Sequence, residues 1–160
     1  KGVKEFTGVG RRYEKHEINF DLNKKILIDD YGHHPIEILS NINACREEFP
    51  KKKICMIFQP HRFSRTAQLF DDFIKILKKV DSLILLDIYA ASEKPIKGID
   101  SRTIVESIKQ LGHKDTLYVK NHSDVIEIIN SKSNKFDILI TQGAGSVSSV
   151  CELIKNKWKK

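Results

Sequence analysis

The feature that most constrains the fold is a regular alternation of short apolar runs with amphipathic segments. Apolar runs with the length of buried strands cover residues 25–29, 53–58, 82–88, 116–119 and 136–141. After each run, across a short connection, apolar residues recur every three or four positions, as they do on one face of a helix. The alternation predicts an α/β fold with a Rossmann-like open sheet, mostly parallel, and with helices on both faces.

The spacing of the apolar residues also gives the expected helices. They cover residues 35–49, 66–79, 101–111, 123–129 and 146–158. Pro35 suits the first position of a helix, Ser123 suits an N-cap, and Gly112 suits the residue that follows a helix.

The first residues depart from this alternation. Residues 1–14 have no sustained period and are interpreted as a loop or linker. Residues 15–20 alternate between polar and apolar, and a polar turn separates them from the strand at 25–29, which predicts a hairpin with one antiparallel edge strand. Because the chain begins at Lys1 and not at Met, we expect it to be part of a longer protein.

The composition narrows the classes of function. With 40% hydrophobic and 31% charged residues, the 160-residue chain fits one globular domain, and its apolar runs are too short to span a membrane. A net charge of +7 also occurs in nucleic-acid binders, but the lysines are scattered, which favours a solvated surface. We therefore predict neither a membrane nor a nucleic-acid partner. The three cysteines lack metal-ligand spacing and are expected in the core.

The loops after the predicted parallel strands carry the chemically active side chains. Ligands of open parallel sheets bind beyond the carboxyl ends of the strands. The candidate loops are residues 29–35 (DDYGHHP), 59–66 (QPHRFSRT), 89–95 and 142–146 (QGAGS). The connections at the opposite edge are plain and polar, so we expect a single site at the carboxyl edge.

Two of these loops each admit two interpretations. Arg62 and Arg65 share a face if the first turn of a helix has begun, and they could then bind a carboxylate or a phosphate. Otherwise they are surface arginines beside a helix cap at Thr66. The turn at 143–146 either brings a ligand close to the backbone or is a tight turn with Ser146 as an N-cap, since it does not complete a dinucleotide-binding motif.

Metal and phosphate sites are not indicated within the chain. The spacing of Asp29, Asp30, His33, His34 and His61 is not that of a transition-metal site, so no metal site is predicted. The sequence has no GxxxxGK[ST] loop, so the phosphates of any bound nucleotide are expected to lie on another domain.

The motifs, taken in order, resemble those of one family. DDYGHHP, FQPHRFSRT, residues 87–101 and QGAG are similar to motifs of the Mur ligases, the amino-acid ligases of peptidoglycan assembly, and GVGRRYE resembles the family's GTGRRF element. They resemble most the branch that joins L-alanine to UDP-N-acetylmuramate. The branch that attaches a recycled peptide is one alternative, and a basic α/β binding module without catalysis is another. Ala90, Ala91 and Ser146 depart from the usual residues of the family.

The resemblance implies an ATP-dependent reaction in which the carboxylate of UDP-N-acetylmuramate is phosphorylated and the amine of L-alanine attacks the acyl phosphate. It implies that residues 1–14 end a central ATPase domain and that residues 15–160 form the C-terminal, amino-acid-binding domain, inactive alone. ATP and Mg²⁺ are the implied cofactors, with the Mg²⁺ ligands mainly on the other domain. The implied setting is the bacterial cytoplasm, in cell-wall synthesis that serves cell shape and division.

The resemblance also implies roles by position. Arg12 and Asp30 match residues that reach the nucleotide. The positions that match the amino-acid and muramoyl side of the site are Tyr31, His33, Arg62 and Arg65. No residue of this chain is expected to be catalytic by itself.

Overall fold

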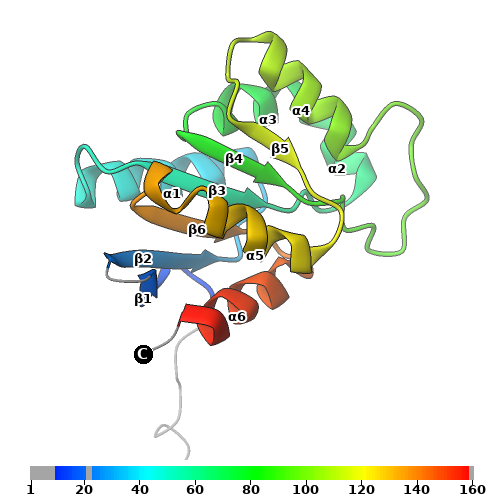
Figure 1. Cartoon of the computed structure of the whole chain (residues 1–160). Helices are drawn as coiled ribbons and strands as arrows, with labels where there is room; N and C mark the ends of the chain where they lie inside the picture. Colours follow the sequence, from blue (N-terminus) through cyan, green and yellow to red (C-terminus); the bar gives the residue numbers. More distant parts are fainter. Residues whose placement is uncertain (1–9, 21–22, 159–160) are drawn as a thin grey trace, which may run out of the picture.

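The computed structural model of the chain describes residues 10–20 and 23–158. They form a six-stranded sheet in the order β1-β2-β6-β3-β4-β5 (Figure 1). Its strands are β1 (Glu14–Phe20), β2 (Asn23–Asp30), β3 (Ile54–Phe58), β4 (Ser82–Leu85), β5 (Thr116–Tyr118) and β6 (Ile138–Gln142). Only the pairing of β1 with β2 is antiparallel in this sheet. The predicted fold class and the predicted hairpin at the edge are confirmed.

Helices cover both faces of the sheet. They are α1 (Pro35–Glu48), α2 (Phe63–Gln68), α3 (Phe70–Leu77), α4 (Ser101–Gln110), α5 (His122–Ser131) and α6 (Val147–Trp158), with a 3-10 turn η1 (Ser133–Lys135). Helices α1, α3 and α4 pack on one face, and α5 and α6 pack on the other (Figure 1). Along β3, Met56 and Phe58 join the first core while Cys55 and Ile57 join the second, so a strand covered on both faces is apolar throughout.

Two helix boundaries differ from the expectations. The helix expected over 66–79 begins earlier, at Phe63, and is interrupted at Leu69 before α3 begins. Leu69 and Phe70 both pack against the first core. Ser123 is not an N-cap, because α5 begins one residue earlier and follows Asn121.

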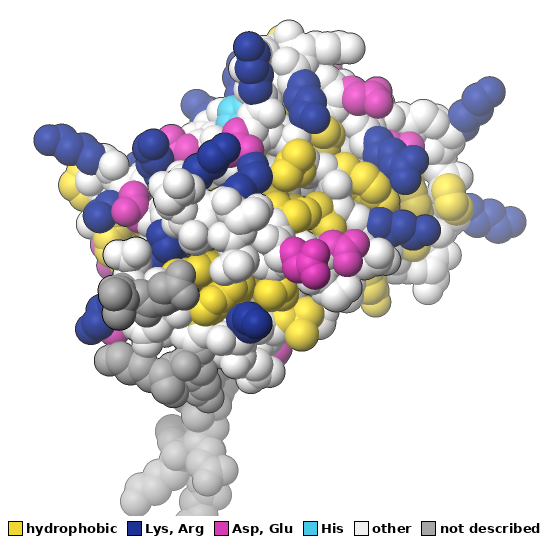
Figure 2. Space-filling model, viewed as in Figure 1, with side chains coloured by type: hydrophobic (Ala, Val, Ile, Leu, Met, Phe, Trp, Pro, Cys, Tyr) yellow, Lys and Arg dark blue, Asp and Glu magenta, His cyan; other side chains and the backbone are white. Residues whose placement is uncertain are grey.

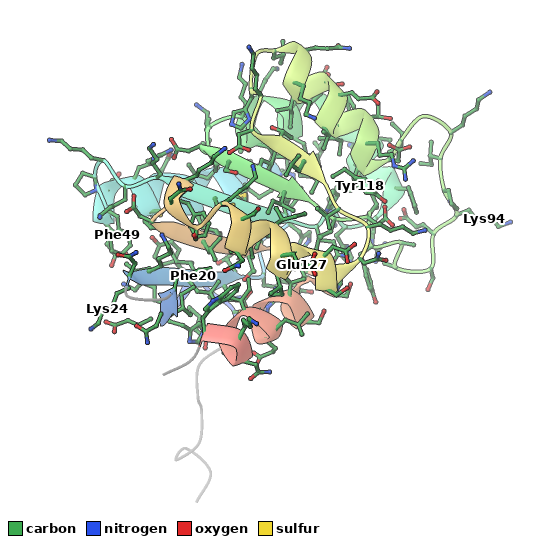
Figure 3. The ribbon with its side chains drawn as sticks, viewed as in Figure 1. Phe20, Lys24, Phe49, Lys94, Tyr118 and Glu127 are labelled. Atoms are coloured by element: carbon green, nitrogen blue, oxygen red, sulfur yellow. The ribbon has the colours of Figure 1, made fainter. Side chains whose placement is uncertain are left out.

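A long connection between β4 and α4, residues 86–100, projects from the molecule (Figure 1). Lys94 lies at its outer end (Figure 3). The start of this connection is held against the loop that follows β3, because Tyr89 forms a parallel bridge with His61. The bridge continues the alignment of β3 and β4 beyond the ends of both strands. The loops after these two strands are therefore held side by side.

The surface is mixed in charge. On the face seen in Figure 2, Lys and Arg side chains stand apart from one another, with acidic and apolar side chains between them. That face offers no continuous basic patch of the kind that a nucleic-acid binder uses. None of the helices in the described ranges is long and apolar enough to cross a membrane.

Candidate functional site

Strand β2 ends in two carboxylates with different partners. Asp29 forms an ion pair with Arg11, whose Nε lies 2.8 Å and Nη2 3.3 Å from the two carboxylate oxygens. The hydroxyl of Thr141 on β6 donates to the same carboxylate at 2.8 Å. Asp29 therefore holds the chain before β1 against the end of the sheet, and its polar contacts are structural.

The neighbouring carboxylate, Asp30, fixes the loop that follows β2. Its Oδ1 accepts hydrogen bonds from the backbone N–H of Gly32 at 2.7 Å and from the side-chain amide of Gln142 at 2.8 Å. Its Oδ2 accepts one, from the backbone N–H of Tyr13 at 2.8 Å. A carboxylate oxygen can accept two hydrogen bonds, so Oδ2 retains the capacity to bind a ligand donor.

A buried glutamine at the end of β6, which was not predicted as a site residue, completes this loop. The side chain of Gln142 donates to the carbonyl oxygen of Gly32 at 2.6 Å and accepts from Asn41 at 3.1 Å. A Cβ at position 32 would lie 2.7 Å from Asp30 Oδ1 and 3.0 Å from the Gln142 amide, so this position needs glycine. The signal that could have found Gln142 is a polar side chain at the carboxyl end of a buried apolar strand, where Gln59 also lies, directly after β3.

His34 is the N-cap of α1. Its Nδ1 accepts from the N–H of Ile36 at 3.3 Å, and Glu37 accepts from the N–H groups of His33 and His34 at 2.9 Å each. Pro35 occupies the first turn as expected. Partial burial alone would raise the pKa of Glu37, but the backbone hydrogen bonds from His34 and His33, together with the electrostatic effect of those two residues, outweigh burial and lower that pKa. The role of His34 in the structure is thus to start a helix.

A hollow of about 420 Å³ lies beside this loop. Both residues that were matched to the nucleotide side, Arg12 and Asp30, line it, and Tyr31 lines it too. The remaining lining comes from Tyr13, Gly32, Ile36, Glu37, Ser40 and Asn41. The hollow combines an exposed cation, a carboxylate with a free acceptor position and apolar surface, which suits a ligand with polar and flat apolar parts.

Four rings form a row across the carboxyl edge of the sheet. The ring centroids of Tyr31 and His33 are 5.6 Å apart, those of His33 and His61 are 5.3 Å apart, and those of His61 and Tyr89 are 5.4 Å apart. These residues come from the loops after β2, β3 and β4. The row confirms that these three loops meet, as the strand directions predicted.

The two arginines of the loop after β3 engage different partners. Arg62 precedes α2 with a positive φ of 71°, so it lies outside the first helical turn and does not follow helical spacing. Its guanidinium faces Glu93 at 3.8 Å, and Glu93 also accepts from the N–H and hydroxyl of Ser64. Arg65 instead donates to Nδ1 and to the carbonyl oxygen of His61, each at 3.3 Å.

Thr66, the alternative cap for this helix, lies inside α2. It is fully buried, and its hydroxyl donates to the carbonyl oxygen of Arg62 at 2.8 Å. The alternative of two surface arginines beside a Thr66 cap is therefore wrong in its cap, and the helix begins at Phe63 without a side-chain cap.

The glycine-rich turn after β6 packs against protein. A Cβ at Gly143, which has a φ of 137°, would lie 2.7 Å from the Gln59 carbonyl oxygen. A Cβ at Gly145 would lie 2.5 Å from Gln59 Oε1 and 2.7 Å from the Cβ of Tyr89. The same Oε1 accepts from the N–H of Val147 at 2.8 Å. Ser146 directly precedes α6, as the alternative of an N-cap required, but its hydroxyl is bonded to the Gln59 side chain, so the side-chain acceptor at the start of α6 is Gln59.

The three cysteines lie in the two cores and are free thiols. Burial raises the pKa of Cys45 and of Cys151 to about 11 and that of Cys55 to about 12, so the thiols stay protonated near neutral pH. Within the ranges that the structure describes, no three His, Cys, Asp or Glu side chains are grouped as metal ligands would be.

A protein-family model covers most of the chain. The model is described as "Mur ligase, glutamate ligase domain", and it matches residues 11–145. The matched region runs from the residues before β1 to the turn after β6, and it therefore contains the hollow and the whole row of rings.

Three solved structures are similar to the chain over nearly all of its length. A UDP-N-acetylmuramate–alanine ligase (MurC) from Thermotoga maritima is 26% identical with a TM-score of 0.69, and the alignment covers 95% of this chain and 30% of that one. A murein peptide ligase from Psychrobacter arcticus is 16% identical with a TM-score of 0.67, covering 94% and 30%. A MurF ligase from Thermotoga maritima, in complex with ADP, is 16% identical with a TM-score of 0.61, covering 94% and 31%. The chain thus spans less than a third of the length of these ligases.

Proposed function

The chain belongs to the Mur ligase family of ATP-dependent ligases, as a domain of the C-terminal, glutamate ligase type, and on that premise we propose that it serves the ligase that joins L-alanine to UDP-N-acetylmuramate. In this proposal residues 15–160 are the amino-acid-binding domain, and residues 1–14, of which 10–14 are described, end the preceding ATPase domain. The carboxylate of UDP-N-acetylmuramate is phosphorylated, and the amine of L-alanine attacks the acyl phosphate. The reaction belongs to peptidoglycan synthesis in the bacterial cytoplasm.

The observation that carries the proposal is the meeting of two half-sites at the carboxyl edge of the sheet. Arg12, Asp30 and Tyr31 line the hollow, and Tyr31 is also the first ring of the row that continues through His33 and His61. Tyr31 is therefore shared by the proposed nucleotide side and the proposed amino-acid side.

The donor set of the hollow fits a nucleotide. Oδ2 of Asp30 can accept a ribose hydroxyl, and the exposed guanidinium of Arg12 can bind ribose or phosphate oxygens. When bound, ATP supplies the phosphoryl group that activates the substrate carboxylate. Its Mg²⁺ ligands are proposed to lie mainly on the preceding domain, which also fits the absence of a phosphate-binding loop from this sequence.

The amino-acid side offers donors for a carboxylate. The side chain of Arg62 is half exposed, and its contact with Glu93 is long, so the guanidinium keeps donors for a substrate anion. Tyr31 is also half exposed and presents a phenol at the same edge. We propose that these side chains, with His33, bind the alanine and muramoyl groups, and that Arg65 belongs to the same side of the site through its contact with His61.

The test uses the protein at its natural length with ATP and UDP-N-acetylmuramate. L-alanine and the peptide L-alanyl-γ-D-glutamyl-diaminopimelate are offered separately, and phosphate release and product mass are measured. We expect L-alanine to be joined. A product formed with the peptide alone would favour the recycling ligase, whose solved relative has nearly the same TM-score, 0.67 against 0.69. No product with either acceptor would contradict both assignments.

A further inference from the structure

The contact between Arg65 and His61 fixes the position of a proton. Nη1 of Arg65 lies 3.3 Å from Nδ1 of the imidazole and 3.3 Å from the carbonyl oxygen of the same residue. A guanidinium has only donors, so Nδ1 must be the acceptor and carries no hydrogen. The neutral ring then carries its proton on Nε2.

The ring is also held in place and kept uncharged. His61 stacks on Tyr89 with the ring planes 15° apart. Partial burial is the main cause that lowers the pKa of His61, and the positive charge of its neighbours lowers it further. The charged or titratable groups that face it are His33, Arg65 and Arg62, which lower its pKa, Glu93, which raises it, and the phenol ring of Tyr89, on which it stacks. His61 is therefore neutral at physiological pH.

The other ring nitrogen is available to a ligand. Nε2 has no hydrogen-bond partner among residues 10–20 and 23–158, and it is not among their buried unpaired atoms. The His61 ring that carries this nitrogen is part of the row of rings at the carboxyl edge, between His33 and Tyr89. A neutral imidazole in this arrangement presents one N–H donor and no free acceptor.

We propose that His61 binds substrate as a neutral hydrogen-bond donor, through Nε2–H to an oxygen of a carboxylate or acyl group, and that Arg65 is a positioning residue that acts through His61. The substrate part of this inference rests on the proposed function. It also means that His61 is not a general base, because Nε2 already carries a proton and Nδ1 is covered by Arg65. Arg65 changes from a residue that contacts the ligand to one that sets a tautomer.

The proton position can be measured without any substrate. In the natural-length protein labelled with ¹⁵N-histidine, two-dimensional ring spectra report which nitrogen carries the proton, and His61→Gln assigns the signal. We expect the Nε2–H form in the unmodified protein. Arg65→Ala should allow the Nδ1–H form to appear, because the only donor to Nδ1 among the described residues is removed.

Arg62→Ala is the matched control for that measurement. Arg62 is a second guanidinium that lowers the pKa of His61 by its charge, but its own contact is with Glu93. Arg62→Ala should therefore leave the Nε2–H form in place. Two results in the unmodified protein would overturn the inference: a proton on Nδ1, or a charged ring at about pH 7.5. An unchanged spectrum in Arg65→Ala would overturn it as well, whatever reaction the protein catalyses.

The role of the donor is tested by kinetics in the same protein. The amide nitrogen of glutamine reaches as far as Nε2, whereas that of asparagine reaches only as far as Nδ1. We expect His61→Asn to lower kcat/KM about 100-fold, as loss of one donor to a reacting oxygen does, and His61→Gln to retain activity within about tenfold. Thermal unfolding of each variant checks that it is folded.

A double-mutant cycle then tests whether Arg65 acts through the ring. Arg65→Ala should reduce kcat/KM in the unmodified protein and should have almost no further effect in the His61→Asn background. Equal losses in His61→Asn and His61→Gln, or an undiminished Arg65 effect in that background, would overturn the assigned roles. If the protein joins neither L-alanine nor the peptide, the proposed function fails and so does the substrate part, while the ring spectra still decide the tautomer.

Discussion

Arg11 joins three segments that are far apart in the sequence. Its side chain binds Asp29 and donates to the carbonyl oxygen of Gly143 at 2.9 Å, and its own carbonyl oxygen accepts from the N–H of Tyr31 at 2.7 Å. The guanidinium also lies 5.7 Å from the centre of the Tyr31 ring. One residue therefore holds the chain segment that contains Arg12 against the end of β2 and the loop that follows it.

We expect Arg11→Ala to lower the free energy of unfolding by about 2–3 kcal/mol, because it leaves the buried Asp29 carboxylate without its cation. Denaturant unfolding measures this change. In the natural-length protein, Arg11→Ala should also raise the Kd for ATP, because the Arg11 side chain no longer holds the end of β2, next to Asp30, which lines the hollow.

Arg46 is a matched control for this prediction. It also binds one carboxylate, that of Asp81, and two backbone carbonyl oxygens. However, the side chains of both partners of this ion pair are more than a third exposed, at 35% and 38%. Arg46→Ala should cost no more than about 1 kcal/mol and leave the Kd for ATP unchanged. Equal effects of the two substitutions on ATP binding would argue against a special role for Arg11.

Gly145 is required by the close approach of the loops after β3, β4 and β6. Because an added Cβ would lie only 2.5 Å from Gln59 and 2.7 Å from Tyr89, we expect Gly145→Ala to lower the free energy of unfolding by about 2 kcal/mol. Gly10→Ala, where the Cβ would meet nothing within 4 Å, should change it by less than about 0.5 kcal/mol. A change of the same size at both positions, measured by denaturant unfolding, would contradict this packing.

At the scale of one element, the start of α1 depends on the charge of Glu37. The folded pKa of this carboxyl is below its ordinary value of 4.5, so the unfolded chain binds its proton more readily than the folded one. The stability that Glu37 contributes is therefore present above about pH 4.5 and is lost as the pH falls below that value. Hydrogen exchange of the α1 amides between pH 7 and pH 3.5 should show the first turn opening at acid pH.

Glu37→Gln separates this effect from general acid unfolding. Glutamine keeps an acceptor oxygen for the N–H groups of His33 and His34 but does not titrate in this range. The variant should be less stable at pH 7, and its stability should fall less between pH 5 and pH 3.5. An equal loss of stability in both proteins between pH 5 and pH 3.5 would show that groups other than Glu37 cause the loss of stability at acid pH.

The elements themselves could be predicted where one pattern governs a whole segment. The apolar run of β3 and the Pro35 start of α1 follow from local spacing, and both are confirmed. The interruption at Leu69 could not be predicted in this way, because the apolar spacing continues across it from α2 into α3. The side-chain acceptor at the start of α6 could not be predicted either, because it is Gln59, which is far away in the sequence.

At the scale of the whole molecule, the strand order explains which site contacts the sequence could and could not indicate. Strand directions alone predicted that the loops after β2 and β3 meet. They did not show that β6 lies between these two strands, since hydrophobic period carries no information about lateral neighbours. Gln142 and Gly143 reach Asp30 on one side and Gln59 on the other for that reason. The pairing of Arg62 with Glu93 likewise depends on the projecting loop and not on any local pattern.

The last helix closes the molecule against its antiparallel edge. Trp158 of α6 stacks on Phe20 of β1, with ring centroids 3.9 Å apart, and is 8% exposed. Trp158→Ala should lower the free energy of unfolding by about 3–4 kcal/mol, because a large buried ring is lost. Leu153→Ala on the same helix, where the side chain is 41% exposed, should cost less than about 1 kcal/mol. Similar losses in denaturant unfolding would mean that α6 is held elsewhere along its length.

The central place of β6 has a consequence for the order of events during synthesis. Residues 138–142 leave the ribosome after every other strand has been made, yet they fill the gap between β2 and β3. A nascent chain that stops short of Ile138 has two unpaired strand edges in the middle of its sheet, which favour association with other chains until β6 arrives. The hydrogen bonds of Asp30 and of Gln59 with Gln142 form only at that moment. The hollow and the row of rings at the carboxyl edge are therefore completed late in synthesis, when β6 pairs with β2 of the N-terminal hairpin and with β3.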